Sequence, residues 1–216
     1  MEGFSGHAMP PTAPDAAIQA VIFDFGNVLC AFDNRRILRA LAPACGLPEE
    51  ELARRIYGSD LPRTYEAGRI GSAEFLAGIS ALCGHAFPEP PFIQAFTDIF
   101  TPIEDTWRLV RALKPRYRLG LLSNTNPWHF AHGIRTTAVF PLFDAVTLSF
   151  EVGALKPDPR LYADAVRKLG LPPSACVFID DIPAFAEGAR AFGMHGLTYT
   201  GTEALEADLR RLGVAF

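Results

Sequence analysis

The chain has 216 residues, of which 49% are hydrophobic and 20% are charged, proportions close to those of globular proteins. This composition excludes a disordered chain, and the formal net charge of −4 argues against broad binding to a nucleic-acid backbone, though not against a small anion at a local positive site. The sequence has no run of about 18 apolar residues, so we predict no membrane partner, and on the ground of its net charge we predict no nucleic-acid partner.

Residues 1–16 are rich in Gly, Pro and Ala without a period, and we predict a flexible N-terminal tail. They show no basic flank followed by an apolar stretch, so we expect no secretory signal. The four cysteines form no CxxC pair, which favours reduced thiols and a cytoplasmic location.

Short apolar runs that are typical of buried strands recur along the chain. The first run covers residues 20–23 and ends at Asp24. Similar runs follow at 119–122, 145–148 and 176–179, with a weaker one at 195–199. Predicted helices at 106–114, 160–169, 184–192 and 204–212 alternate with these strands. Because strands that alternate with helices pair in parallel, we predict an α/β fold with a doubly wound parallel sheet.

Residues 33–100 differ from the rest of the chain because they show helical patterns and no strand pattern. We predict helices over 35–44, 48–57, 61–67, 72–82 and 91–100, with Ser72 as a helix cap. This segment is therefore interpreted as a small all-helical insertion after the first strand. The predicted core comprises residues 17–32 and 101–216.

Chemically active residues lie at the ends of the predicted strands. They are Asp24, the pair Ser123 and Asn124, Lys156, and the pair Asp180 and Asp181. Carboxylates cluster only where a cation offsets their repulsion, and such oxygen ligands suit Mg²⁺, which keeps water or substrate phosphate in its shell. A lysine and a hydroxyl beside the metal would bind the other phosphate oxygens.

An Asp in such a site can act as a covalent nucleophile and form an aspartyl-phosphate that water later hydrolyses. Removing phosphate from an ester depends mainly on positioning and on charge neutralisation, which this set of residues supplies. The strand-end residues therefore predict phosphoryl-transfer chemistry.

Four segments, FDFGNVL, LLSNTN, GALKPDPRLY and FIDD, resemble in order the four motifs of the haloacid dehalogenase-like (HAD) hydrolase superfamily. The segment YEAGRIGSAEF is similar to the helical cap of sugar-phosphate-type phosphatases of that superfamily. The resemblance covers nearly the whole chain from residue 19. It implies a Rossmann-like core with a helical cap over residues 33–100, and a Mg²⁺-dependent phosphatase that acts on a small phosphorylated metabolite.

The resemblance also implies roles for single residues. Asp24 matches the nucleophile, which is also a metal ligand. Ser123 matches the phosphate-binding hydroxyl, and the backbone N–H of Asn124 lies beside it in the family. Lys156 matches the lysine that steadies the nucleophile and the phosphate.

For the metal, the carbonyl of Gly26 matches the backbone ligand. Asp181 matches the direct Mg²⁺ ligand, and Asp180 matches a neighbour that often acts through a water molecule.

The sequence departs from the family pattern at two positions. Most phosphatases of the family carry a second Asp two residues after the nucleophile, which protonates the leaving oxygen, whereas this chain has Gly26 there. General acid–base catalysis is typically worth about 10²–10⁴-fold, so the loss of this Asp should lower activity. Another group could substitute for it, and Asp33, His129 and His132 lie in plausible loops. At the second position Phe185 replaces a polar residue of the metal's surroundings, which predicts weaker metal binding.

Each of these residues also has an ordinary structural interpretation. Asp24 could cap a turn, residues 123–126 could form only a polar turn, and Asp180 and Asp181 could cap the next helix. Lys156 could be a solvated loop lysine. Trp128 is favoured as a packing residue over a substrate-stacking one. Arginines of the insertion are interpreted as a largely solvated face, although one could contact substrate: Arg35, Arg36, Arg39, Arg54 and Arg55.

Two further functions stay open at this level. A metal-independent 2-haloacid dehalogenase would use Asp24 against carbon and also lacks the second Asp, but the retained pair Asp180 and Asp181 and the lysine–proline motif favour metal and phosphate. A degenerate, non-catalytic binding protein is the other alternative, suggested by Gly26 and Phe185.

Overall fold

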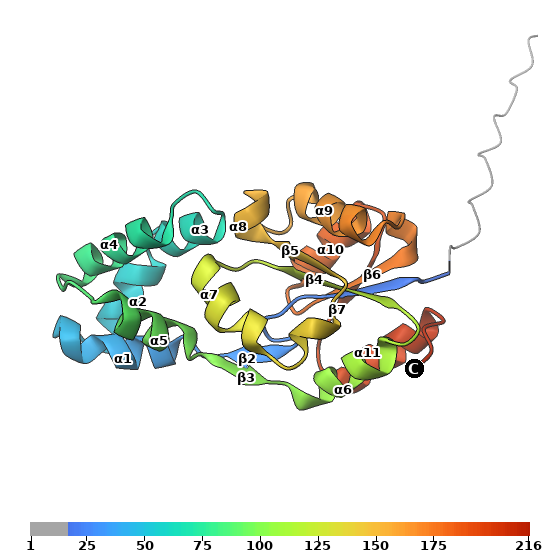
Figure 1. The fold of residues 1–216 in the computed structure, drawn as a ribbon, viewed down its shortest axis with the longest axis horizontal. Coiled ribbons are helices and arrows are strands. Elements are labelled where there is room, and N and C mark those ends of the chain that lie inside the picture. Colours follow the sequence, from blue (N-terminus) through green and yellow to red (C-terminus); the bar gives the residue numbers. More distant parts are fainter. Residues whose placement is uncertain (1–16) are drawn as a thin grey trace, which may run out of the picture.

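The computed structural model describes residues 17–216, and its centre is a five-stranded parallel sheet (Figure 1). The strand order is β5-β4-β1-β6-β7. The strands are β1 (Ala20–Phe23), β4 (Arg118–Ser123), β5 (Ala145–Leu148), β6 (Cys176–Asp180) and β7 (His195–Thr198). All pairs are parallel, so the carboxyl ends of the strands lie at one edge. The predicted tail, residues 1–16, lies outside the described residues.

Helices cover both faces of the sheet (Figure 1). Helices α6 (Glu104–Leu113) and α11 (Thr202–Arg211) pack on one face with the side chains of Val21 and Phe23. Helices α9 (Pro159–Leu169) and α10 (Pro183–Ala191) pack on the other face with Ala20 and Ile22. Because alternate residues of β1 enter opposite apolar cores, the strand is hydrophobic at every position. The prediction of a doubly wound α/β fold is confirmed.

Five helices fill the insertion between the first two strands of the sheet. They are α1 (Arg35–Cys45), α2 (Glu49–Tyr57), α3 (Leu61–Glu66), α4 (Ser72–Cys83) and α5 (Glu89–Thr97). Their apolar sides enclose a separate cluster that contains Tyr65, Phe75 and Phe96, and Trp128 joins this cluster from α7 (Pro127–His132) of the sheet region. Trp128 is thus a packing residue. Ser72 is not the helix cap that we predicted, because Gly71 holds that position and the Ser72 hydroxyl lies 2.7 Å from the Tyr65 hydroxyl.

A two-stranded antiparallel ribbon joins the insertion to the sheet region, and the sequence did not predict it. Strand β2 (Cys30–Phe32) pairs with β3 (Phe100–Pro102). The last insertion helix consequently ends at Thr97, before the predicted end at residue 100. Strands of three residues are too short to show an alternating pattern, which explains why they escape sequence analysis.

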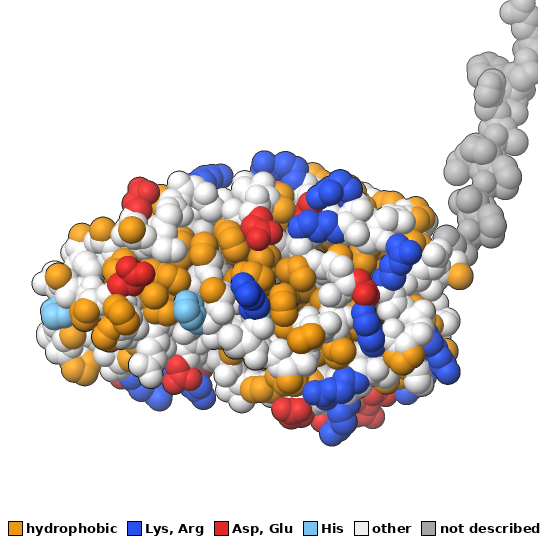
Figure 2. Space-filling model, viewed as in Figure 1, with side chains coloured by type: hydrophobic (Ala, Val, Ile, Leu, Met, Phe, Trp, Pro, Cys, Tyr) orange, Lys and Arg blue, Asp and Glu red, His pale blue; other side chains and the backbone are white. Residues whose placement is uncertain are grey.

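The remaining short elements surround the carboxyl edge of the sheet or connect its helices. They are α8 (Ser149–Val152) and the 3₁₀ turns η1 (Ile134–Thr136), η2 (Phe140–Leu142) and η3 (Pro173–Ala175). Hydrophobic side chains gather in the middle of one face of the molecule, over α7 and α8 (Figure 2). Within the described residues, no helix combines the length and apolar character needed to cross a membrane.

Candidate active site

Three charged side chains from distant segments meet at the carboxyl edge of the sheet. Asp24 directly follows β1, Asp180 ends β6, and Lys156 lies in the loop between α8 and α9. The Lys156 Nζ lies 2.8 Å from Oδ1 of Asp24 and 2.5 Å from Oδ2 of Asp180. At most 11% of any of these side chains is exposed. Charges this deeply buried are tolerated only when they are paired, so the lysine is the counter-ion of both carboxylates.

The ionisation of these three groups is strongly shifted. Burial raises the pKa of Asp24 and that of Asp180, and the positive charge of Lys156 opposes both shifts. Burial by itself would lower the pKa of the Lys156 ammonium, but the charges of Asp24 and Asp180 outweigh it and hold that pKa above its ordinary value. The lysine therefore stays protonated, while the carboxylates require more positive charge than one ammonium supplies.

A third carboxylate makes this excess of negative charge larger. One oxygen each of Asp24, Asp180 and Asp181 lie within 4.8 Å of one another. Hard carboxylate oxygens in such a group suit Mg²⁺, and a divalent cation would neutralise the surplus charge. The donor set therefore fits a magnesium ion.

The two neighbouring acidic residues are not equivalent. Asp180 accepts hydrogen bonds at both oxygens, from the Lys156 ammonium and from the Ile182 N–H at 2.9 Å. Asp181 is more open and accepts a hydrogen bond of 3.0 Å from the Asn27 side chain. Asp181 and Asp24 are accordingly better placed as direct ligands than Asp180.

Asn27 is a residue that the sequence analysis missed. It adopts a left-handed backbone conformation with φ of +52°, the one such non-glycine among the described residues. Asn tolerates this conformation better than most residues, and here the conformation accompanies a side-chain contact with Asp181. Its position beside Gly26 in the turn after the first strand is the signal that could have identified it.

Ser123 ends β4 and Asn124 follows it, and β4 lies on the opposite side of β1 from β6 in the strand order. Ser123 is buried and lines a cavity of about 110 Å³ together with Gly26, Asn124 and Thr125. The Asn124 side chain accepts a hydrogen bond of 2.9 Å from the backbone N–H of Lys156. Asn124 therefore fixes the loop that carries the lysine, a contact that the sequence did not indicate.

Phe185, the second departure from the family pattern, lies beside the lysine. The Lys156 Nζ is 5.2 Å from the centre of the Phe185 ring and 5.4 Å from that of Phe178. Aromatic faces attract a cation at such distances. Whether Phe185 weakens metal binding stays a prediction, but its ring has an evident role in holding the ammonium.

The insertion reaches the site through the end of α3. The Ser149 hydroxyl accepts a hydrogen bond of 2.9 Å from the Thr125 N–H, and its Oγ lies within donating distance of the carbonyls of Glu66 (2.6 Å) and Thr125 (2.9 Å). Next to it, Gly68 packs so closely on α8 that a Cβ there would lie 2.1 Å from the carbonyl oxygen of Phe150. These contacts hold the Glu66 backbone against the sheet region.

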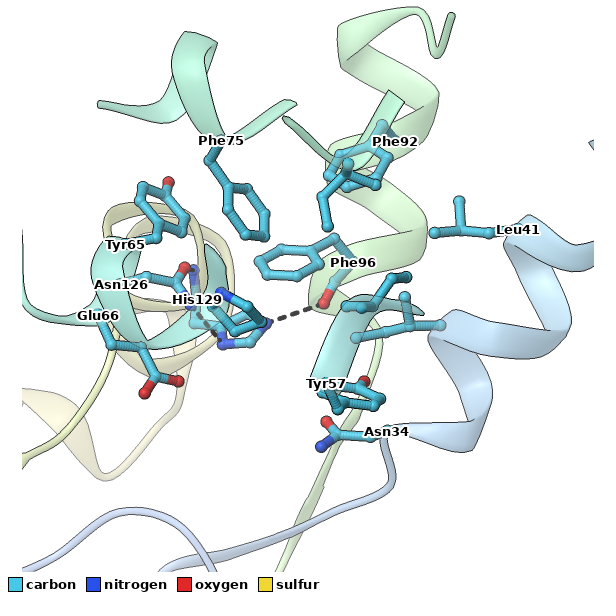
Figure 3. A pocket seen from close by; sticks show the side chains of 14 residues that line it. Asn34, Leu41, Tyr57, Tyr65, Glu66, Phe75, Phe92, Phe96, Asn126 and His129 are labelled. Carbon is cyan, nitrogen blue, oxygen red and sulfur yellow. Dashed lines mark hydrogen bonds between the residues drawn. The ribbon is translucent and has the colours of Figure 1, made fainter. Parts of the chain in front are cut away.

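Glu66 lies where two cavities adjoin. It lines the cavity beside Ser123 and also a smaller one of about 60 Å³ inside the insertion, together with Asn34 and His129. Figure 3 shows the smaller cavity, and there the Glu66 carboxylate points away from the rings of Phe75 and Phe92. Glu66 lies in the segment YEAGRIGSAEF, and no local feature of the sequence marked it as a site residue.

Both nitrogens of His129 are engaged in hydrogen bonds, drawn as dashed lines in Figure 3. Nε2 lies 3.0 Å from the Phe96 carbonyl, which can only accept, so Nε2 donates and Nδ1 accepts from the Asn126 amide at 3.0 Å. Burial lowers the pKa of His129 to about 4. A neutral histidine with both nitrogens occupied is a structural link between α7 and α5.

The other candidates from the sequence lie away from the two cavities. The Asp33 carboxylate accepts a hydrogen bond of 2.9 Å from the Arg35 N–H, and His132 is exposed. Four arginines of the insertion form ion pairs with neighbouring acidic residues: Arg36, Arg39, Arg54 and Arg55. None of these residues, nor Arg35, lines either cavity beside Glu66, as expected for a solvated face.

Comparison with known proteins agrees with this geometry. A model of haloacid dehalogenase-like hydrolases matches residues 18–193. The chain is 33% identical to Phosphatase MT3486 of Mycobacterium tuberculosis over 82% of this chain and 85% of that protein. It is 25% identical to D-ribitol-5-phosphate phosphatase of Bacteroides thetaiotaomicron over 76% of this chain and 83% of that protein.

Among solved structures, a magnesium complex of a HAD family enzyme from Bacteroides thetaiotaomicron is similar, with a TM-score of 0.75 and 25% identity. The similarity covers 90% of this chain and 100% of that one. The chain therefore belongs to the haloacid dehalogenase-like hydrolase family.

Proposed function

We propose that the protein is a Mg²⁺-dependent phosphatase that hydrolyses a small phosphorylated metabolite through an aspartyl-phosphate intermediate. The observation that carries this proposal is the buried contact of Lys156 with Asp24 and Asp180, next to the third carboxylate of Asp181. A nucleophilic carboxylate, a fixed positive charge and a cluster of oxygen ligands are the groups that phosphoryl transfer requires.

Each residue then has a defined task. Asp24, Asp181 and the carbonyl of Gly26 would hold the metal, with Asp180 next to them. A bound Mg²⁺ neutralises charge on the transferring phosphoryl group. Asp24 attacks phosphorus with the carboxylate oxygen that would not hold the metal, and Lys156 offsets the negative charge of both the nucleophile and the phosphate.

The cavity beside Ser123 is the proposed phosphate site. The Ser123 hydroxyl and the Asn124 N–H would donate hydrogen bonds to phosphate oxygens, and the Lys156 ammonium adds a third donor. Water then attacks phosphorus, the bond to the Asp24 oxygen breaks, and inorganic phosphate leaves with the Asp24 carboxylate restored.

The proposed substrate class draws support from the names of the relatives. Two of them are phosphatases, and the name of one specifies D-ribitol 5-phosphate, a small phosphorylated polyol. We also propose that residues 33–100 act as a cap, because helix α3 lies over the site and the aromatic cluster of the insertion closes the smaller cavity. Such a cap would exclude water during phosphoryl transfer.

The test is phosphate release from a panel of small phosphate esters in Mg²⁺. The wild-type protein should release phosphate, EDTA should stop the reaction, and Asp24→Asn should abolish it because an amide cannot serve as the nucleophile. Unchanged turnover in Asp24→Asn would remove Asp24 from this role.

The absence of a side chain at Gly26 also fits a dehalogenase, in which the Asp24 carboxylate would attack the carbon atom that carries the halogen. Chloride release from 2-chloropropionate that persists in EDTA would favour that function. The carboxylate cluster of Asp24, Asp180 and Asp181 favours the phosphatase.

A further inference from the structure

The position two residues after the nucleophile carries no side chain and has little free space around it. A Cβ built on Gly26 would lie 3.1 Å from Cε1 and 3.3 Å from Cδ1 of the Phe32 ring, tighter than ordinary contact. Phe32 belongs to β2, and the residue is 42% exposed although its backbone pairs with β3. A side chain at position 26 would require this ring to shift by a few tenths of an ångström. Because Gly26 itself has no side chain, the proton donor of the reaction has to come from another residue.

Glu66 is placed to be that donor. It lines the cavity that contains Gly26 and Ser123, and thus approaches the phosphate site from the insertion. The same side chain borders the smaller apolar cavity, where the leaving group of a substrate would extend. A carboxyl at this junction would lie beside the oxygen that joins the phosphate to the leaving group of a bound substrate.

The groups around Glu66 come from several elements. Arg63 is on the same helix, Lys156 comes from the sheet region, Tyr57 from α2 and His129 from α7. Burial raises the pKa of Glu66 to about 7, while the positive charges of Arg63 and Lys156 act in the opposite direction. A carboxyl that titrates near neutral pH can both donate and accept a proton there.

We propose that Glu66 is the general acid and general base of the proposed phosphatase reaction, in place of the family's second Asp. The inference rests on the proposed function. As the Asp24 oxygen bonds to phosphorus and the ester P–O bond breaks, the Glu66 carboxyl gives its proton to the leaving oxygen, which departs as an alcohol. In the second half, the Glu66 carboxylate takes a proton from the attacking water, the bond to Asp24 breaks, and Glu66 is protonated again.

The other acid–base candidates are less suitable. The Asp33 carboxylate is occupied by the Arg35 N–H and lines neither cavity. His129 borders both cavities, but its two nitrogens are engaged by Asn126 and Phe96. Glu66 is the acidic residue that lines both cavities among the described residues.

The experiment compares two aryl esters of similar shape, p-nitrophenyl phosphate and phenyl phosphate, in Mg²⁺. The first has a leaving group that departs readily without a proton, and the second does not. Glu66→Gln should lower kcat/KM for phenyl phosphate by about 10²–10⁴-fold, the usual worth of general acid catalysis, and for p-nitrophenyl phosphate by less than about tenfold. The control Asp33→Asn should change kcat/KM for either ester by less than about twofold, well below the roughly 10²–10⁴-fold effect of general acid catalysis.

The pH profile adds a second readout. Since the protonated carboxyl is the active form in the first step, wild-type kcat/KM for phenyl phosphate should fall as pH rises through about 7. In Glu66→Gln this decrease should be absent, because an amide does not titrate. The variant should still bind inorganic phosphate in Mg²⁺, since Lys156 and Ser123 are unchanged.

The outcomes separate this inference from the proposed function. Equal losses for the two esters, or no loss, in Glu66→Gln would overturn the role of Glu66 while the phosphatase function stands. Hydrolysis that survives Asp24→Asn, or a wild-type protein inactive on both esters, would overturn the proposed function and the role of Glu66 with it. Burial raises the pKa of Asp180 to about 7 as well, so carbon-13 NMR of the carboxyl groups has to compare variants. A signal that titrates near pH 7 in the wild type should be missing in Glu66→Gln and retained in Asp180→Asn, and a wild-type spectrum without such a signal would contradict the inference.

Discussion

Lys156 is the residue on which the arrangement of the site depends. Its side chain is 1% exposed, and its ammonium contacts two carboxylates that are themselves buried. The lysine has two carboxylate partners, whereas each carboxylate has the lysine as its only cationic partner among the described residues. Removing the lysine would leave two uncompensated buried charges.

We therefore predict that Lys156→Met destabilises the protein by about 3–5 kcal/mol, the usual cost of breaking a buried ion pair from one side. Urea unfolding in EDTA at neutral pH measures this change. The control is Lys114→Met, which removes a more exposed pair with Asp144 and should cost at most about 1 kcal/mol. Equal effects of the two substitutions would contradict the description of Lys156.

For single residues, the sequence could predict which side chains at the ends of strands belong to the candidate site. Asp24, Ser123 and Asp181 were identifiable because the carboxyl ends of parallel strands meet at one edge. The contribution of Glu66 depends on how an insertion helix packs against α8, and that packing has no local sequence pattern. The ring of Phe32 over Gly26 depends equally on a ribbon too short to predict.

Among the elements, the contact of α3 with α8 determines where Glu66 lies. Gly68 and Gly84 have the same left-handed backbone, with φ of +65° and +66°, but only Gly68 is in close contact, with the Phe150 carbonyl, whereas nothing lies within 4 Å of a Cβ at Gly84. A substitution at Gly84 therefore tests backbone strain alone, whereas the same substitution at Gly68 tests backbone strain together with packing.

Substituting Ala at each position should show this difference. Gly84→Ala should cost about 1–2 kcal/mol, from the left-handed conformation alone. Gly68→Ala should cost about 1–3 kcal/mol more, since the Cβ forces α3 away from α8, and it should also lower kcat/KM. Denaturant unfolding and steady-state kinetics of the two variants provide the test, and the same stability for both would contradict this account of α3.

The link between α7 and α5 through His129 should make stability depend on pH. The folded-state pKa of about 4 lies below the ordinary value of 6.5, so the unfolded chain binds more protons between these values. Stability from this group is complete above pH 6.5 and is lost as pH falls toward 4. The loss should not exceed about 3.5 kcal/mol, from a pKa difference of about 2.5 units at about 1.4 kcal/mol per unit.

Urea unfolding between pH 7 and pH 4.5 would reveal this loss in the wild type. His129→Gln should have a shallower pH dependence, because glutamine does not titrate, while the exposed His132→Gln should follow the wild type. A variant His129→Gln with an unchanged slope would show that another group controls acid stability.

Most elements were predictable from the sequence because periodicity and helix stops are local. Gly46 and Gly170 end α1 and α9 in the left-handed conformation, at the places the sequence indicated. The helices and strands that were missed, β2, β3, α7 and α8, have three to six residues each, too few for a period to be recognised.

For the molecule as a whole, the three clustered carboxylates imply that Mg²⁺ binding stabilises the folded state. A ligand that binds only the folded protein adds about 2.7 kcal/mol when its concentration is a hundred times Kd. Millimolar Mg²⁺ should therefore raise the Tm of the wild type above its value in EDTA. In Asp181→Asn the increase should largely disappear, whereas Asp208→Asn, on the distant helix α11, should retain it.

A Tm that is the same with and without Mg²⁺ in the wild type would contradict a metal site at these carboxylates.

The aromatic cluster links the unfolding of the insertion to that of the sheet region. Trp128 belongs to α7 yet packs with Tyr65, Phe75 and Phe96 of the insertion. Calorimetry should therefore show one unfolding transition for the two parts.

The central claim is that Asp24 accepts the phosphoryl group. Borohydride reduction during turnover converts an aspartyl-phosphate into homoserine, which mass spectrometry can locate in the sequence. With phenyl phosphate and Mg²⁺, we predict homoserine at position 24 in the wild type and none at any position in Asp24→Asn. Reduction at another acidic residue, or active turnover with position 24 unmodified, would contradict the account.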